Sequence, residues 1–359
     1  KPIALCFLSN MISVNDKNLW NREIVSHPFM VSSMVRPCSP QVEPSFLQSW
    51  QWGELQKRLG RRVFRMNVSG LLASAIEQKL PFGQTYLYVP HGPVIREATA
   101  DSWTNFIKAA GNLGGFKKPV FLRVEPPNNE FCGEPIQKIL KEAGFRQTKP
   151  VQPKTTLVIN LRKDEKEILE AMEHDTRYSI RTAEKRGVTV EFASGNDKEK
   201  SFEIFWQIFM ETNRRHGLKT YPKLYYEEVA MLDGSTSLTI KGKCSSKIAI
   251  ARTEGEAISA AMFIYFGERV FYLFAGSRAG YGKFNAPTYL LWQAIREAKK
   301  TGYRYFDFWG ISHENKNWAK ITAFKKSFGG EEITSAGAWD YVFNKPAYFA
   351  YNLAKRLTG

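Results

Sequence analysis

The sequence has few residues of the kinds that build disulfide frameworks and metal sites. Its 359 residues include 4 cysteines and 5 histidines. No two cysteines form a C-x-x-C pair, which is typical of a reduced, cytosolic chain. The histidines show neither H-x-x-x-H nor H-E-x-x-H spacing, so we expect no metal site and no bound cofactor. The cysteines lie far apart, at Cys6, Cys38, Cys132 and Cys244.

Long apolar runs are also missing. The apolar run Ile3 to Leu8 is too short to span a bilayer and lacks a small-residue cleavage site. It could be a fragment of a signal sequence, but we favour an edge strand or residues upstream of a start at Met11. A cytoplasmic location is therefore expected.

Acidic residues are scarce relative to basic ones. There are 51 lysines and arginines against 35 acids, which gives a net charge of +16. This excess predicts an anionic partner, because a positive potential raises the local concentration of polyanions. tRNA, phosphate-bearing small substrates and anionic lipid all qualify, and composition does not choose among them. With 43% hydrophobic and 14% aromatic residues, the chain is globular.

Two domains of one fold class are predicted. The chain is too long for one comfortable core, and strands alternate with helices, as in α/β layer architectures. The prolines between Phe145 and Ile159 mark the junction. We place one domain at 11–152 plus 327–359 and the other at 153–326. Because both halves repeat the same strand and helix order, the pattern indicates a tandem duplication.

One continuous helix is predicted over 164–186, with Gly187 as its stop. Arg177, Arg181 and Lys185 are spaced i, i+4 and i+8, so they form one basic stripe on it. Periodicity alone leaves a solvated stripe and a ligand-binding stripe equally open.

The segment 305–331 carries the second candidate cation. A short aromatic strand, Tyr305 to Trp309, ends at Gly310, and Gly329-Gly330 close the segment. From spacing alone, Phe324 and Phe328 suit a core stripe with Lys325 and Lys326 both solvated. The alternative is that one of these lysines holds its charge in a half-buried cleft.

A glycine-rich turn follows a predicted strand at 276–282 and precedes a predicted helix. Its backbone N–H groups could cradle the pyrophosphate of an acyl-CoA. This signal is weak, and a plain turn is the better explanation of the glycines.

Four blocks together resemble the Fem (FemABX) family of aminoacyl-tRNA-dependent peptidyltransferases, which build the cross-bridges of peptidoglycan. The blocks occur in that family's order: Phe46–Gly53 (FLQSWQWG), Thr176–Val188 (TRYSIRTAEKRGV), Asn285–Pro287 (NAP), and Asp307–Ile311 (DFWGI) with Phe324–Glu331 (FKKSFGGE). The resemblance implies two acyltransferase domains of the GNAT type, with the C-terminal piece rejoining the first.

The resemblance also implies roles for individual residues. Lys325 falls where the family has a cation near the reacting carbonyl, so it is expected to stabilise the oxyanion, with Lys326 as backup. The expected substrate-binding residues are Lys57, Arg177, Tyr178, Arg181, Arg215, Tyr221, Asn285, Phe324 and Lys326.

Two features depart from the family pattern. Where relatives often carry an aspartate after Gly92-Pro93-Val94, this chain has Ile95-Arg96-Glu97. Either Glu97 substitutes as general base, or the substrates shuttle the proton themselves, which we favour. The coiled-coil arm of some members is also absent, since no heptads are sustained.

The expected function is transfer of an amino acid from aminoacyl-tRNA to the stem peptide of a UDP-linked or lipid-linked muropeptide precursor. We expect a monomer that makes at most transient contact with the inner membrane surface. The alternatives are an N-acyltransferase that uses acyl-CoA, and a non-enzymatic RNA-binding or membrane-surface protein.

A last helix is predicted from Pro346 to Leu357, rich in aromatic and basic residues. Docking of this helix through Phe349 and Leu353 is favoured over contact of the helix with lipid headgroups.

Overall fold

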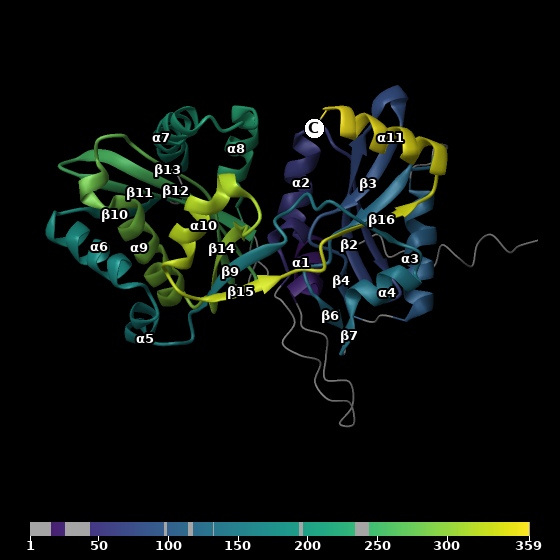
Figure 1. Ribbon diagram of the computed structural model, residues 1–359, viewed down its shortest axis with the longest axis horizontal. Coiled ribbons are helices and arrows are strands. Elements are labelled where there is room, and N and C mark those ends of the chain that lie inside the picture. Colours follow the sequence, from purple (N-terminus) through teal and green to yellow (C-terminus); the bar gives the residue numbers. More distant parts are fainter. Residues whose placement is uncertain are drawn as a thin grey trace, which may run out of the picture. The chain divides into compact units, whose positions relative to one another are not determined.

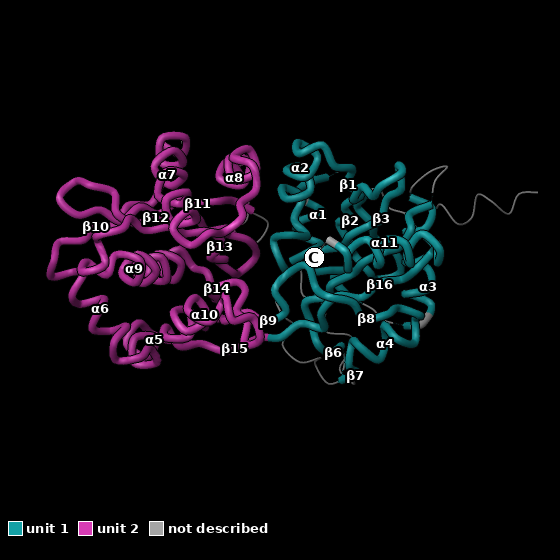
Figure 2. Tube along the Cα trace, turned by 45° about the horizontal axis from the view of Figure 1, so that its top comes forward, with its two compact units in different colours: residues 1–154, 334–359 teal, residues 155–333 magenta. Residues whose placement is uncertain are grey.

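The computed structural model describes residues 16–25, 44–96, 99–113, 118–131, 133–193, 197–233 and 244–358. Two compact units divide the chain (Figure 2). Unit 1 comprises Lys1–Lys154 and Thr334–Gly359, and unit 2 comprises Thr155–Ile333. The α/β class expected from the alternation of strands and helices is confirmed in both units. Within the described ranges, no helix is both long and apolar enough to cross a membrane.

Unit 1 is built on a seven-stranded sheet in the order β1-β2-β3-β5-β16-β8, with β4 paired to β2. β3 and β5 pair in parallel, whereas β16 lies antiparallel to both β5 and β8. The end of the chain therefore completes the first sheet. The strands are β1 Val63–Val68, β2 Leu71–Lys79, β3 Thr85–Val89, β4 Val94–Ile95, β5 Phe121–Val124, β8 Arg146–Thr148 and β16 Ala338–Val342, with a separate hairpin of β6 Glu130–Phe131 and β7 Glu134–Pro135.

Helices cover both faces of this sheet (Figure 1). α3 (Ala100–Asn112) and α4 (Ile136–Glu142) pack on one face, where Trp103 and Phe106 are fully buried. The rings of α11 (Lys345–Thr358) lie on Phe121, which points to the other face because its neighbour Leu122 belongs to the first core. α1 (Lys17–Val25) and α2 (Trp50–Arg58) complete the unit.

The sequence predicts one helix from Ser45 to Leu59, whereas the Phe46 block begins with a short 3₁₀ turn. Ser45 caps that turn, and Ser49 caps α2 by accepting a hydrogen bond from the Trp52 amide. Trp52 is in the core, and Trp50 is half-buried beneath the Arg65 guanidinium at 3.5 Å. A Cβ at Gly53 would lie 2.7 Å from that guanidinium, so the glycine gives Arg65 its space.

Unit 2 is built on a second seven-stranded sheet, in the order β10-β11-β12-β13-β14-β9-β15. β10 to β13 form an antiparallel run, β13 and β14 pair in parallel, and β9 runs antiparallel to β14. The strands are β9 Thr155–Asn160, β10 Thr189–Ala193, β11 Cys244–Thr253, β12 Glu256–Phe266, β13 Arg269–Ser277, β14 Tyr305–Ile311 and β15 Glu331–Thr334. The strand expected at 237–240 lies outside the described residues.

Two layers of helix enclose the second sheet (Figure 1). α9 (Ala286–Lys300) and α6 (His174–Lys185) share one core with the sheet. α7 (Lys198–His216) packs against β11, β12 and β13 from the opposite face with a row of buried phenylalanines. The remaining helices are α5 Glu165–Glu170, α8 Lys223–Ala230 and α10 Ala319–Lys326.

The single helix expected over 164–186 is wrong, because two helices occupy it. A capping box between Asp164 and Glu167 starts α5, which ends at Glu170. The Glu173 amide then donates to the Ser327 carbonyl, 2.9 Å away, instead of continuing a helical ladder. A partner more than 150 residues away in sequence thus ends one helix and starts the next.

Candidate active site

A β-bulge in β14 forms the floor of the candidate site. The pairing register with β9 shifts between Asp307 and Gly310, and Trp309 in between has a φ of 59°. That left-handed conformation is costly for a bulky residue. The Asp307 carboxylate holds it by accepting the Trp309 amide at 2.7 Å. It also accepts the Thr156 hydroxyl from β9, so one carboxylate stabilises both sides of the bulge.

Asp307 is itself buried and paired. Its second carboxylate oxygen accepts from Arg269 Nη1, 2.8 Å away on β13, and each side chain is less than a twentieth exposed. A buried carboxylate requires such a partner, because an isolated charge in the interior is strongly disfavoured. The bulge is therefore locked by an ion pair that reaches across to the neighbouring strand.

α10 lies against the bulge and carries Lys325. Reciprocal hydrogen bonds between Ser312 and Thr322 tie the helix to the end of β14. Lys325 Nζ donates to the Gly310 carbonyl at 2.7 Å. Since Gly310 is the first residue to resume pairing after the bulge, the bulge and the lysine are one structural feature.

Burial lowers the pKa of Lys325 from 10.5 to about 8, and the nearby Asp307 carboxylate opposes this only in part. The ammonium is 5.8 Å from the centre of the Tyr272 ring, a weak further attraction. A lysine ammonium has three N–H donors, and among the described residues only the Gly310 carbonyl accepts one from it. At neutral pH the site thus holds a mostly protonated, buried cation with donors to spare.

Two glycines fix the depth of α10. Gly329 and Gly330 have φ values of 74° and 102°. A Cβ on Gly329 would lie 2.6 Å from the Ala171 carbonyl oxygen, and one on Gly330 would lie 2.7 Å from that of Val158. Because backbone cannot yield as a flexible side chain does, only glycine lets the chain pass there. The two glycines that close the FKKSFGGE block therefore hold Lys325 against the bulge.

Phe324 and Phe328 pack toward the core and Lys326 is solvated, as their spacing predicts. Phe328 is in the core, and Phe324, partly buried, meets its ring edge-on at 5.5 Å. Lys326 is exposed and paired with Glu332 at 2.9 Å. Hydrogen bonds from Lys326 and His313 lower the pKa of Glu332. The interpretation in which both lysines are solvated is wrong for Lys325, which is buried.

α6 starts beside the end of α10. Thr176 Oγ1 donates to Ser327 Oγ at 2.8 Å, so the TRYSIR block and the FKKSFGGE block meet. Arg177 turns back and donates to the carbonyls of Glu170 and Met172, where it bridges α5 and α6. Tyr178, 59% exposed, and Arg181 face outward. Of the basic stripe, Arg177 is thus partly engaged in the fold and Arg181 is available to a ligand.

Arg215 and Tyr221 form a second group after α7. Arg215 donates to the Ser277 carbonyl at 3.0 Å and lies 3.7 Å from Glu211. The exposed ring of Tyr221 lies 4.6 Å from that of Tyr225, which continues into an aromatic wall with Tyr226. The structure places this group at the C-terminal end of β13.

Three amides at the start of the glycine-rich turn are already hydrogen-bonded within the protein. The amides of Ser277, Arg278 and Ala279 are taken by Thr212, by the Ile258 carbonyl and by Glu211, respectively. A Cβ on Gly276 would lie 2.7 Å from the Ile208 carbonyl oxygen, so this glycine serves close packing of α7 on β13. These contacts favour the plain-turn interpretation over a pyrophosphate cradle.

Two further candidates lie near the ends of their elements. Asn285 begins α9 with a φ of 53° and makes no side-chain capping bond. Lys57, exposed on α2 of unit 1, is 2.9 Å from Glu54. Glu97 lies outside the described residues. Among the described residues, no cluster of three or more His, Cys, Asp or Glu side chains could hold a metal ion.

Sequence reasoning assigned no role to the residues that lock the bulge. Asp307 belongs to the DFWGI block, but we assigned it no function from the sequence. A lone acid before two aromatic residues and a glycine was the signal that could have identified it. Arg269 and Thr156 gave no local signal, because they reach Asp307 only through strand pairing. A buried acid of unit 1, Glu125, was also missed: it accepts from the Tyr88 hydroxyl at 2.6 Å and from the Val151 amide at 2.6 Å.

Comparison with known proteins gives a consistent result. The profile of the FemAB family matches residues 39–233 and 233–356. A lipid II:glycine glycyltransferase from Staphylococcus aureus (strain USA300) is 23% identical over 381 residues, which cover 84% of this chain and 89% of that protein.

Solved structures agree on the fold. The crystal structure of FemX aligns with a TM-score of 0.76 and 18% identity, over 93% of this chain and 98% of that one. The C-terminal domain of a putative lysylphosphatidylglycerol synthetase from Agrobacterium fabrum aligns with a TM-score of 0.53 and 12% identity, over 84% and 89%. The expected two-unit α/β fold is thereby confirmed.

Proposed function

The chain belongs to the FemAB family of aminoacyltransferases, and we propose that it moves an amino acid from aminoacyl-tRNA to an amine in the stem peptide of a peptidoglycan precursor. The name of the Staphylococcus aureus relatives supports a lipid-linked acceptor. The net charge of +16 supports an anionic donor such as tRNA. Because aminoacyl-tRNA is a cytoplasmic metabolite, the reaction is proposed for the cytoplasmic side of the membrane.

In the proposed reaction, the acceptor amine attacks the carbonyl carbon of the aminoacyl ester. A C–N bond forms and the carbonyl oxygen becomes an oxyanion in the tetrahedral intermediate. Collapse breaks the ester C–O bond, and the tRNA ribose hydroxyl leaves with the proton that the amine gives up. Because the ester is already activated, the enzyme mainly has to align the reactants and stabilise the oxyanion.

The buried ammonium of Lys325 is the observation that carries the proposal. A cation in a site of low polarity stabilises developing negative charge more strongly than one in water does. Its bond to the Gly310 carbonyl fixes its position before substrate arrives. Such preorganisation is what makes an oxyanion contact effective, since no reorganisation is needed during the reaction.

The remaining roles follow from the placement of the side chains. Arg181 and Tyr178 present a cation and a ring on the exposed side of α6, next to the end of α10. Arg215 is positioned to clamp a phosphate, and Tyr221 to pack against the ligand that it holds. Phe324, next to Lys325 in sequence, packs on Phe328 and the core. Further ligand contacts are assigned to Arg177, Asn285, Lys326 and Lys57.

Proton removal is assigned to the substrates. The oxygen of the leaving group and the attacking nitrogen are close together in the tetrahedral intermediate. A proton can therefore pass from the nitrogen to the oxygen without an enzyme base. Glu97 is the alternative base, and Glu97→Gln tests it. A loss of turnover that a higher pH does not restore would assign the base to Glu97.

A transfer assay tests the proposal. Wild-type protein is incubated with precursor and either labelled aminoacyl-tRNA or labelled acyl-CoA, with both nucleotide-linked and lipid-linked acceptors. Label should appear in the stem peptide from aminoacyl-tRNA alone. Transfer from acyl-CoA would favour the N-acyltransferase, and binding of RNA without any transfer would favour a non-enzymatic role.

A further inference from the structure

Phe82 is exposed in a way that the packing of unit 1 does not explain. It lies in the short 3₁₀ turn Pro81–Gly83 between β2 and β3, and its side chain is 99% exposed. Its φ of 59° adds the backbone cost of the left-handed region. A large ring held outward on a strained turn, with a proline before it and a glycine after it, is a feature of a contact surface.

α11 has one docked face and one bare face. Its docked face is made by Tyr348 and Tyr351, whose rings lie 5.2 and 5.1 Å from that of Phe121. The Tyr348 hydroxyl also donates to Asp340 at 2.8 Å. The expectation that Phe349 and Leu353 dock this helix is therefore wrong, because the tyrosine row does so.

The bare face is apolar. Phe349, Leu353 and Leu357 are 72%, 50% and 81% exposed. Their i, i+4, i+8 spacing places them in one stripe along the helix. α11 contains no acidic residue, and it carries three cations. These are Lys345, Lys355 and Arg356.

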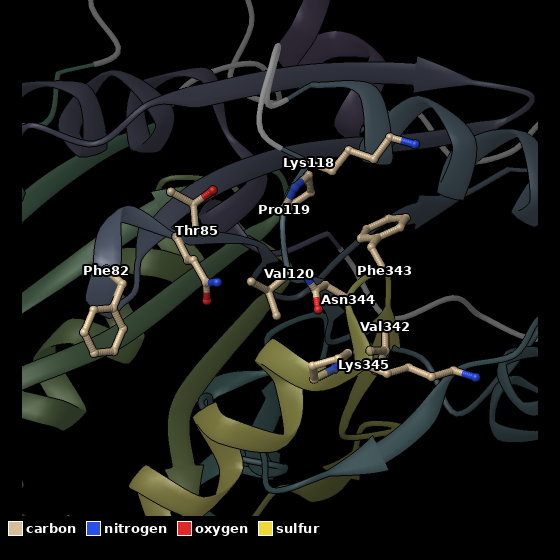
Figure 3. Close-up of a pocket in the computed structure, with 11 residues that line it drawn as sticks. Phe82, Thr85, Lys118, Pro119, Val120, Val342, Phe343, Asn344 and Lys345 are labelled. Carbon is tan, nitrogen blue, oxygen red and sulfur yellow. The ribbon is translucent and has the colours of Figure 1, made fainter.

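Phe82 and the start of α11 border one cavity. A pocket of about 720 Å³ is lined by Phe82, Lys118, Lys345 and Pro346, among others. Figure 3 shows Val120 and Asn344 in the middle of this cavity, with Phe82 toward one end and the two lysines toward the other. Phe82 and the first turn of α11 thus lie on one surface of unit 1, together with Lys118 and Lys345.

We propose that this surface binds the face of an anionic lipid bilayer. We call it the lipid face and define it by Phe82, Lys118, Lys345, Phe349, Leu353 and Leu357. The apolar side chains would enter the boundary between headgroups and acyl chains, and the lysines would meet the headgroup phosphates. Lys118 and Lys345 both line the cavity that Phe82 borders.

Charge favours a bilayer over a second copy of the chain. In a two-fold dimer the same patch meets itself, so the cations of α11 would face one another on a protein whose net charge is already +16. An anionic surface removes that repulsion. The proposal rests on the proposed function, in which a lipid-linked precursor brings the enzyme to the membrane. Contact through one helix and one ring is expected to be reversible.

Vesicle co-sedimentation tests the lipid face without substrate. Full-length protein is mixed with vesicles of phosphatidylcholine alone or of phosphatidylcholine with phosphatidylglycerol. Wild type should sediment with the anionic vesicles, and high salt should weaken this binding. The variant F82S/F349S/L353S/L357S should lose at least about tenfold in vesicle affinity. Val151→Ser, which alters another exposed apolar residue of unit 1, is the matched control and should bind as wild type does.

Two further measurements separate the possible outcomes. Thermal melting should be unchanged in the quadruple variant, because its four side chains are exposed. Transfer to a soluble nucleotide-linked acceptor should also be unchanged, so failure of the lipid face and failure of the transferase proposal are distinguishable. Equal vesicle binding by wild type and the folded quadruple variant would overturn the proposal. So would a wild-type dimer that the quadruple variant converts to monomer, with no vesicle binding by either.

Discussion

Each unit of this protein buries one arginine–aspartate pair between neighbouring strands, and the two pairs are built differently. In unit 1, Arg123 on β5 and Asp340 on β16 are direct partners in the strand register. They form two hydrogen bonds of 2.7 Å each, and a third comes to Asp340 from Tyr348. Both side chains are essentially inaccessible. The charges are satisfied, and nothing in the arrangement is left for a ligand.

In unit 2 the corresponding pair does more than compensate charge. Arg269 donates one hydrogen bond to Asp307, whose other oxygen restrains the strained bulge at Trp309. Next to the bulge, Lys325 is buried, and no acid of the described part of the chain forms an ion pair with it. Strain and an under-satisfied cation are tolerated where a fold is used for chemistry and are selected against elsewhere. The comparison therefore assigns scaffolding to the first pair and, under the proposed function, positioning of Lys325 to the second.

The largest expected effect is on the stability of unit 1. Asp340→Asn leaves the Arg123 charge buried without its counterion and should lower the free energy of unfolding by about 3–5 kcal/mol. Denaturant titration measures the loss. The turnover of the protein that remains folded should be close to that of wild type. A large loss of turnover at full stability would show that the unit 1 pair is not merely scaffold.

Lys325→Met should lower turnover and leave stability intact, which is the opposite of the result expected for Asp340→Asn. Loss of the oxyanion contact should raise the barrier by about 2–4 kcal/mol, as kcat falls while the acceptor KM changes little. The fold should not lose stability, because a buried cation that shifts its pKa down is one whose charge the fold disfavours. Steady-state kinetics and a thermal melt check both results.

Lys320→Met is the matched control for that variant, since Lys320 lies on the same helix and is exposed. It should leave kcat and the melting temperature unchanged. If Lys325→Met melts earlier and keeps its turnover, the bond to Gly310 is structural and the catalytic role is wrong.

The pH dependence of turnover and of stability also tests the role of Lys325. The folded pKa of Lys325, about 8, lies below its ordinary value of 10.5. Above pH 8 the folded protein loses the cation, so turnover limited by oxyanion stabilisation should fall by up to about tenfold per pH unit.

The free energy of unfolding should change in the other direction over the same range. Between about pH 8 and 10 the unfolded chain binds more protons at Lys325 than the folded chain does, so this residue's contribution to stability rises with pH. The same titrations on Lys325→Met should lack both effects. A turnover profile that stays flat through pH 8 in wild type would contradict the assignment.

Sequence reasoning reached the fold class and the family because both rest on patterns that stay local. Four blocks in order identify the family, and the alternation of strands and helices identifies the layers. It missed what depends on distant partners: the break between α5 and α6 is set by Ser327, and the bulge is held by Arg269 and Thr156. The sequence left the burial of Lys325 undecided for the same reason. Its depth depends on the close approach of Gly329 and Gly330 to the backbone at the end of α5 and in β9, which are distant in sequence.

The smallest expected effect concerns Arg215. It is intermediate between the fully satisfied Arg123 of unit 1 and the under-satisfied Lys325 of unit 2. It is paired with Glu211 but remains 35% exposed, so it keeps donors for an incoming anion. Arg215→Ala should raise the acceptor KM by roughly five- to tenfold, about 1 kcal/mol, with little change in kcat. Added salt should shrink the difference from wild type, because an exposed phosphate contact is screened. Arg214→Ala is the matched control, since Arg214 is also exposed and adjacent in sequence, and it should leave KM unchanged. If Arg215→Ala leaves the acceptor KM at its wild-type value and only lowers the melting temperature, the bond to Ser277 is the whole function of this arginine, and the phosphate clamp has to be sought elsewhere.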